Sequence, residues 1–239
     1  MVDTILDQFT EAIRQAISRR RPVRIRGSGS KDFYGGASQG EVLDTTAYRG
    51  VIDYAPEELV ITARAGTPLA EIEAALAVNG QMLPFEPPHF GPRATLGGCV
   101  AAGLSGPRRA SLGAVRDFVL GIQMMDGKAD PLRFGGQVMK NVAGYDVSRL
   151  MAGSLGTLGL ILEVSLKVLP RPKDEATLQF ECDEVLALQK MNRWAGAPLP
   201  ISATCYHDQV LTLRLSGAKA AVQAAPAKLG GQALVAGEE

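Results

Sequence analysis

The sequence has only three cysteines and two histidines among its 239 residues. Cys99, Cys182 and Cys205 are widely spaced and form neither a Cys-x-x-Cys pair nor a disulfide framework, which favours a reducing compartment such as the cytoplasm. An iron–sulfur cluster normally takes four cysteine ligands, so the chain has too few for a cluster of its own. His-x-His does not occur, and we expect no metal site.

The sequence also lacks an excess of charge of one sign and a long apolar run. Lys plus Arg and Asp plus Glu both total 25, so no overall basic field would attract nucleic acid. The most apolar stretch, 150–169, contains several glycines, Glu163 and Lys167, and falls short of the roughly 18 apolar residues of a spanning helix. The first residues do not resemble a signal peptide. We expect a soluble protein with no transmembrane segment and no nucleic-acid partner.

The patterns that are present predict an α+β protein. Apolar residues at every fourth position predict a helix over 5–17, followed by a short strand at 23–26. Hairpins are predicted within 51–65 and 118–134. The remaining expected elements of this part are a helix over 68–78, a Gly- and Pro-dense functional loop over 84–113 and a strand over 158–169.

A second pattern begins after the Pro-rich segment 170–172. Its elements follow the order βαββαβ, which is typical of a ferredoxin-like unit. The expected elements are strands at 176–182, 201–206, 210–215 and 232–235 and helices at 183–194 and 218–228. We therefore predict a boundary near Pro170, with residues 1–170 in one domain and 171–239 in another.

Three segments rich in small residues suggest a binding site. The first is Arg26-Gly27-Ser28-Gly29-Ser30-Lys31, directly after a strand, where consecutive backbone N–H groups can turn toward a phosphate. It is not a Rossmann fingerprint, because Asp32 occupies the third glycine position, and it lacks the Walker ending. An ordinary tight turn is the alternative.

The second segment runs over 92–106 and the third over 153–161. Small side chains leave the backbone open to a flat ligand. The second segment could equally be a small-residue helix packed against a sheet, and the third a turn with a bulge. Convergence of all three would indicate a large, phosphorylated ligand.

The order and spacing of these segments resemble the FAD-binding domain of vanillyl-alcohol-oxidase-type flavoproteins, also called the PCMH type. In 94–121 and in 135–169, the chain resembles the FAD-binding subunits of bacterial glycolate oxidases. The resemblance implies an α+β fold in which two α+β subdomains enclose FAD, followed by a partial ferredoxin-like cap. It also implies an oxidoreductase subunit that is not active alone.

The resemblance further implies which residues contact FAD, and it assigns no catalytic residue. The residues expected at the pyrophosphate and ribityl groups are Arg26, Gly27, Ser28, Gly29, Ser30, Lys31, Thr95, Leu96, Gly97 and Gly98. Ala102, Gly103 and Ser105 are expected along the flavin, and Gly156, Gly159 and Ile161 near the adenine.

Two departures from the family pattern matter. Some relatives attach flavin covalently through a histidine just after the first glycines, and here Ser30 stands at that position, so we expect non-covalent FAD. Family chains also continue past a complete cap, whereas this one stops at Glu239. The sequence leaves open whether it is a truncated or a natural short form.

The implied partners are a second FAD-containing subunit and an iron–sulfur subunit of a glycolate oxidase complex, which oxidises a small 2-hydroxy acid. The complex would place the chain in the cytoplasm or at the periphery of the inner membrane. One rival is a self-sufficient 2-hydroxy-acid dehydrogenase, which needs a base near the flavin and an arginine such as Arg108, Arg109 or Arg116 for the substrate carboxylate. The other rival is a scaffold that has lost the cofactor.

Two further features have open interpretations. His89 lies near the expected flavin loop and either faces the flavin or is a structural loop histidine, while His207 is expected to be solvated at a hairpin turn. Lys140, Asn141, Tyr145 and Asp146 form a polar cluster that either contacts the flavin or a partner, or caps a helix.

Overall fold

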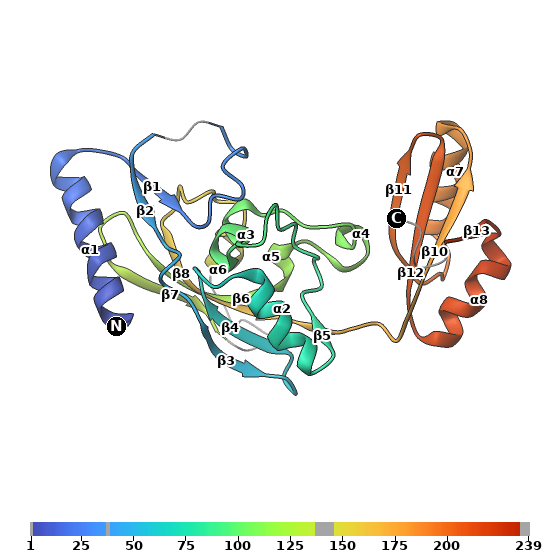
Figure 1. The fold of residues 1–239 in the computed structure, drawn as a ribbon, viewed down its shortest axis with the longest axis horizontal. Helices are drawn as coiled ribbons and strands as arrows, with labels where there is room; N and C mark the ends of the chain where they lie inside the picture. Colours follow the sequence, from blue (N-terminus) through green and yellow to red (C-terminus); the bar gives the residue numbers. More distant parts are fainter. Residues whose placement is uncertain (1, 37–38, 137–145, 235–239) are drawn as a thin grey trace. The chain divides into compact units, whose positions relative to one another are not determined.

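The computed structural model describes residues 2–36, 39–136 and 146–234, which form two compact units (Figure 1). Unit 1 comprises Met1–Gly106 and Gly113–Leu169, and unit 2 comprises Pro107–Leu112 and Pro170–Glu239. The chain therefore passes between the units at three points. Most of the polar cluster expected at 140–146 lies outside the described residues, but Asp146 caps a short helix, α6 (Val147–Leu150), by accepting a hydrogen bond from the Arg149 N–H at 3.2 Å.

The N-terminal part of unit 1 is a helix on a pair of parallel strands. Helix α1 (Val2–Arg19) confirms the predicted amphipathic helix, and β1 (Val23–Arg26) pairs in parallel with β2 (Glu41–Asp44). The apolar stripe of α1 is buried at Phe9 and Ile13, against Leu43 of β2. Strand β2 was not predicted, because four residues with one buried side chain give no clear alternation.

The larger part of unit 1 is a five-stranded antiparallel sheet, with strand order β3-β4-β8-β6-β7. The predicted hairpins are both present: β3 pairs with β4, and β6 pairs with β7 across a turn in which Asp126 accepts two backbone hydrogen bonds. Strands β5 and β9 form a separate two-stranded sheet. Their bounds are β3 (Val51–Ala55), β4 (Val60–Arg64), β5 (Gln81–Met82), β6 (Val119–Met125), β7 (Pro131–Gly135), β8 (Leu160–Lys167) and β9 (Leu169–Pro170).

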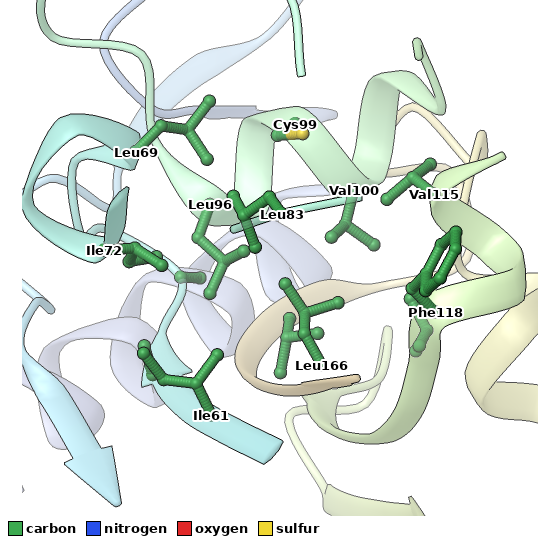
Figure 2. Packing of buried hydrophobic residues seen from close by; sticks show 14 of the residues in the cluster. Ile61, Leu69, Ile72, Leu83, Leu96, Cys99, Val100, Val115, Phe118 and Leu166 are labelled. Atoms are coloured by element: carbon green, nitrogen blue, oxygen red, sulfur yellow. The ribbon is translucent and has the colours of Figure 1, made fainter. Parts of the chain in front are cut away.

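Helices α2 (Leu69–Val78) and α3 (Leu96–Ala102) pack with this sheet around the main core (Figure 2). A fully buried leucine or isoleucine, such as Ile72 or Leu166, contributes about 1.5–3 kcal/mol relative to an exposed one. The prediction of a loop throughout 84–113 is wrong, because α3 forms within it. Its small residues let α3 lie close to β4 and β8, so the alternative of a small-residue helix packed on a sheet is confirmed. Helix α5 (Val115–Phe118) follows.

Unit 2 has the predicted order β-α-β-β-α-β. Its antiparallel sheet has the strand order β11-β12-β10-β13, and its core gathers on Leu211, Leu213 and Leu215 of β12. Both helices contribute to that core, α7 through Trp194 and α8 through Val222. The bounds are β10 (Asp174–Glu181), α7 (Glu184–Ala195), β11 (Ile201–His207), β12 (Val210–Gly217), α8 (Lys219–Leu229) and β13 (Gln232–Ala233).

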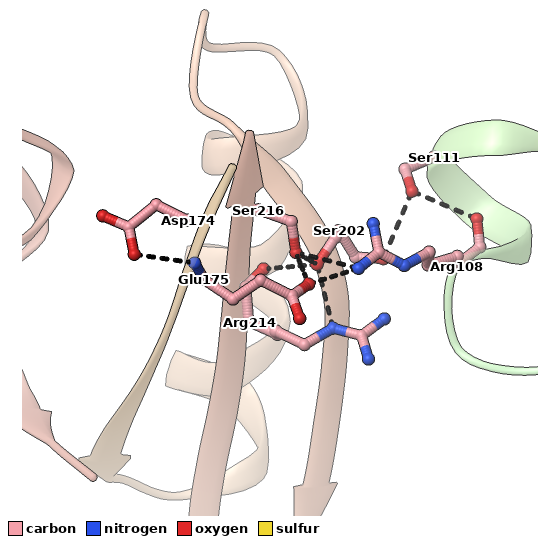
Figure 3. Close-up of polar contacts among 7 residues, drawn as sticks. All are labelled: Arg108, Ser111, Asp174, Glu175, Ser202, Arg214 and Ser216. Atoms are coloured by element: carbon pink, nitrogen blue, oxygen red, sulfur yellow. Dashed lines mark hydrogen bonds and ion pairs between the residues drawn. The ribbon is translucent and has the colours of Figure 1, made fainter. Parts of the chain in front are cut away.

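The segment Pro107–Leu112 packs on unit 2 through α4 (Arg109–Leu112), which contacts β11 (Figure 3). The guanidinium of Arg108, only 7% exposed, donates to the carboxylate of Glu175 and, at 3.2 Å, to the Ser216 hydroxyl. Ser111 donates to the Ser202 carbonyl oxygen at 3.2 Å. The arginine therefore secures this six-residue segment to strands β10 and β12.

We expect Arg108→Met to lower the free energy of unfolding of unit 2 by about 2 kcal/mol. Removing one partner of a buried ion pair costs about 3–5 kcal/mol, and the figure is reduced because the Glu175 side chain is 46% exposed. Trp194 is the only tryptophan and lies in the unit 2 core, so its fluorescence in a urea titration follows this unit. Arg109→Met, at an exposed neighbour, is the control and should change stability by less than about 0.5 kcal/mol. Equal effects of the two substitutions would contradict the role of Arg108.

Candidate functional site

Unit 1 contains a cavity of about 350 Å³ lined by all three small-residue segments. The first segment follows β1, the second contains α3, and the third precedes β8. The fold brings them together although they are far apart in the sequence. The predicted residues that line the cavity are Arg26, Gly27, Ser28, Gly29, Ser30, Lys31, Thr95, Gly97, Gly98, Ala102, Gly156, Gly159 and Ile161. Leu96, Gly103 and Ser105 do not line it.

The first segment presents free backbone donors. Within the described part of the chain, the N–H groups of residues 27–31 donate to no protein acceptor, whereas the N–H groups of Asp32 and Tyr34 are bonded to carbonyls of the same loop. Gly29 has a φ of +77°, which only glycine adopts without strain and which turns the chain at this point. Five consecutive unpaired amides beside a cavity are suited to anionic oxygens.

The charge of this loop is arranged differently from the expectation. Arg26 is paired with Asp32 at 2.7 Å, and the same carboxylate receives Arg24 at 3.1 Å. The hydrogen bond from Arg26 lowers the pKa of Asp32, so the carboxylate stays ionised. Sequence reasoning missed Arg24 and Asp32; the signal was the i, i+2 spacing of two arginines on one strand, which places both on one face.

Lys31 supplies a cation that no described residue neutralises. It is half-buried, and burial lowers the pKa of its ammonium. Its Nζ lies 5.7 Å from the centroid of the Phe90 ring. No carboxylate among the described residues forms an ion pair with it. A partly desolvated charge without a counterion favours an anionic ligand in the cavity.

The second segment contributes small side chains to the cavity wall rather than free hydrogen-bond donors. Thr95 caps α3 by accepting from the Gly98 N–H at 3.3 Å, and the Leu96 and Gly97 N–H groups donate to the carbonyls of Thr67 and Ala65 at 2.9 and 2.8 Å. These first-turn amides are therefore already satisfied by the protein. Contacts from this segment to a ligand would come from its exposed backbone and the Thr95 side chain.

Glycine is required where the segments meet. A Cβ on Gly27 would lie 2.4 Å from Thr95 Oγ1, so no other residue lets the first loop approach α3 this closely. A Cβ on Gly97 would lie 2.7 Å from the Cβ of Ala65 on the neighbouring chain segment. At Gly98, in contrast, a Cβ would have one neighbour within 4 Å, Thr95 Oγ1 at 3.1 Å. Gly98 is thus the member of this pair with room toward the cavity.

The three predicted residues outside the cavity wall have structural roles. Leu96 is buried in the main core. Gly103 ends α3 with a φ of +68°, where a Cβ would lie 2.9 Å from Gly153 Cα. The Ser105 hydroxyl accepts from the Val115 N–H at 2.9 Å.

The residues considered for chemistry lie away from the cavity wall. His89 pairs with Glu73 at 3.2 Å, and His207 is 80% exposed beside Asp208. Cys99 points into the main core, where burial raises the pKa of its thiol to about 12 (Figure 2). Over the described ranges, no group of three His, Cys, Asp or Glu side chains is placed to hold a metal ion.

Comparison with known proteins identifies the family. A model of the FAD binding domain matches residues 5–135. The chain is 54% identical over 222 residues to glycolate oxidase subunit GlcE of Escherichia coli (strain K12), covering 93% of this chain and 63% of that protein. It is 31% identical over 175 residues to glycolate oxidase subunit GlcD of Bacillus subtilis (strain 168), covering 72% of this chain and 37% of that protein. The chain thus spans less than two thirds of these relatives.

The fold agrees with this assignment. A solved structure of alkyldihydroxyacetonephosphate synthase superimposes with a TM-score of 0.70 at 17% identity, covering 92% of this chain and 47% of the other. Among the helices that the structure describes, none has the length and apolar character needed to cross a membrane. The matched segment contains β1, the free amides of residues 27–31 and α3, which are the parts that form most of the cavity wall. The chain belongs to the FAD-binding domain family, and FAD is its cofactor.

Proposed function

We propose that the chain is the FAD-binding subunit of a complex that oxidises glycolate or a similar 2-hydroxy acid. It holds FAD without a covalent bond, so that electrons pass between the flavin and partner subunits. The observation that carries this proposal is the cavity lined by residues 27–31, whose N–H groups have no acceptor among the described residues and whose Lys31 has no ion-pair partner among them.

These residues suit the diphosphate of FAD. A diphosphate bridge brings two negative charges, which backbone N–H groups and an ammonium can stabilise. Asp32 is the nearest acid of the loop, and its charge is offset by Arg24 and Arg26. Flat surfaces at Gly98 and Gly156 leave room for the ring systems. Bound FAD supplies the redox chemistry, and the chain supplies binding and orientation.

The partners follow from the relatives and from the composition. Two relatives are named as subunits of glycolate oxidase, which supports assembly with a second FAD-containing subunit. With three cysteines, the chain would depend on a separate iron–sulfur subunit for a cluster. We place this complex in the cytoplasm, peripheral to the inner membrane.

A self-sufficient dehydrogenase is less well supported by the site. Arg108, one of the arginines considered for the substrate carboxylate, is buried in its ion pair with Glu175 in unit 2. His89, the histidine closest to the expected flavin loop, is paired with Glu73. The two rivals differ from the proposal in observable ways: turnover by the chain alone marks a complete enzyme, and absence of flavin marks an empty scaffold.

The purified chain is expected to be yellow and to release all of its flavin on acid precipitation. The reason is that no histidine or cysteine among the described residues lines the cavity: Ser30 stands where a histidine would attach, and the Cys99 thiol is buried with a pKa of about 12. The measurement is flavin absorbance of the supernatant and fluorescence of the denatured band on a gel. Fluorescence that stays with the polypeptide would refute non-covalent binding, and a colourless protein that takes up no added FAD would refute the proposed function.

A further inference from the structure

A second cavity of about 350 Å³ lies in unit 1 beside the end of α1. It is bounded by α1, by β1 and β2, by the turn at 126–127 between β6 and β7, and by residues 156–160 (Figure 1). It shares wall residues such as Val23 and Gly156 with the first cavity, but it opens beside α1, whose residues do not line the first. The function proposed above uses the shared wall residue Gly156 but not the part of this cavity beside α1.

The interior of this second cavity is aliphatic. Ile13, Ile17 and Leu158 are among its lining residues, and Ile17 and Leu158 are 50% and 46% exposed. Its volume is near the lower end of the range of about 300–1,000 Å³ found for small-molecule sites. An apolar space of this size fits one alkyl chain.

Apart from two arginines, the polar side chains of the wall are the Thr157 hydroxyl and the Asp126 carboxylate, and both are already engaged. The Thr157 hydroxyl donates to the Ser154 carbonyl oxygen at 2.7 Å, and Asp126 Oδ1 accepts from the N–H groups of Lys128 and Asp130 at 2.8 and 2.9 Å. A nucleobase or a sugar would need free donors and acceptors to replace its bonds to water. The wall therefore favours an aliphatic ligand over a nucleotide or a carbohydrate.

Two arginines give the cavity a net positive charge, since Asp126 is the one acidic side chain among its lining residues. Arg20 and Arg21 both line the cavity, both are exposed, and neither forms an ion pair with another described residue. They follow the C-terminus of α1, where the helix dipole favours cations. An aliphatic interior with cations at its edge is complementary to an anionic head attached to an apolar tail.

We propose that this cavity binds an anionic amphiphile with a single alkyl chain. The chain packs between Ile13, Ile17 and Leu158, and its carboxylate or phosphate head lies against Arg20 and Arg21. One buried chain gives weak binding, with an association constant on the order of 10⁴ M⁻¹. Because binding is weak, the fraction of sites that are occupied varies with the local concentration of the amphiphile.

The test is calorimetric titration of the full chain with dodecyl phosphate below its micelle concentration. We expect a dissociation constant on the order of 0.1 mM, weakened about 5-fold by Arg20→Gln and about 5-fold by Arg21→Gln. Leu158→Asp should abolish binding, because it places a carboxylate on the apolar wall. Arg14→Gln is the matched control: Arg14 is an exposed arginine of α1 that does not line the cavity. Dodecyl maltoside, which has the same chain without charge, should bind much more weakly.

Vesicles separate the two sources of such a ligand. Binding to phosphatidylglycerol but not phosphatidylcholine vesicles, lost in Arg20→Gln with Arg21→Gln, would identify a membrane lipid. Binding of dodecyl phosphate without vesicle binding would identify a free amphiphile, and both results support the site. No heat at about 1 mM dodecyl phosphate, equal binding of the maltoside, or an equal loss in Arg14→Gln would overturn the proposal.

Discussion

A Gly98→Asp variant will lose FAD binding while the protein remains folded. The Cβ of the new residue has one neighbour within 4 Å, Thr95 Oγ1 at 3.1 Å, which a small shift of that side chain relieves, and residue 98 lines the same cavity as residues 27–31. A carboxylate there would repel the diphosphate. Two like charges about 4 Å apart interact by about 4 kcal/mol at the dielectric typical of such sites, which corresponds to an affinity loss on the order of 1,000-fold.

The apo form of this variant should be as stable as the wild type. Residue 98 is in the first turn of α3, where a negative side chain interacts favourably with the helix dipole and where glycine is a poor helix former. The measurements are FAD titration by flavin fluorescence and thermal unfolding of the apo proteins. Gly98→Asn is the control for size without charge and should retain most of the affinity.

Gly97→Ala is the control for a substitution that acts on protein stability. Its Cβ would lie 2.7 Å from the Cβ of Ala65, so the substitution disturbs the packing of α3 and should lower the unfolding temperature of the apo protein. FAD bound at wild-type occupancy by a folded Gly98→Asp protein would show that this segment has a structural role only.

The FAD-loaded chain, assayed without other subunits, will oxidise glycolate at least about 100-fold more slowly than a typical enzyme, which turns over about 10 times per second. Oxidation of a 2-hydroxy acid needs a base near the flavin and a cation for the carboxylate. Among the described residues, His89 and Arg108 are held by Glu73 and Glu175, and His207 is exposed. None of them lines the cavity of the three segments.

The assay is reduction of a dye acceptor with glycolate, with D-lactate as a second substrate. The same protein mixed with the proposed partner subunits is the positive control, because restored turnover shows that the flavin is competent. Turnover near 10 per second by the chain alone would establish the self-sufficient dehydrogenase instead.

Local sequence patterns were sufficient to predict most of the fold. The four-residue repeat of Ile5, Phe9, Ile13 and Ile17 specifies α1, because a helix buries one stripe. The turn signal at Asp126-Gly127 specifies the hairpin of β6 and β7. Strand β2 and helices α4, α5 and α6 were missed, since each has four residues and gains its stability from tertiary contacts.

The common cavity of the three segments was predictable from the sequence, but its hydrogen bonding and ion pairing were less so. Three segments of small residues indicated a common cavity, because only a close ligand or a close backbone explains such runs. Which amides are free depended on partners distant in sequence, such as the Ala65 carbonyl that occupies the Gly97 N–H. The pairing of Arg26 with Asp32, rather than with a ligand, also depends on the three-dimensional path of the loop.

The segment Pro107–Leu112 limits how this protein can be divided into separate fragments. Since this segment belongs to unit 2 while both of its flanks belong to unit 1, the two units are interleaved and cannot be separated by one cut at residue 170. A fragment ending at Leu169 would keep Arg108 but lose Glu175 and Ser216, which accept from its guanidinium, and the strand β11 that α4 contacts. Chimaeras that exchange unit 2 between relatives must therefore exchange both pieces of chain together.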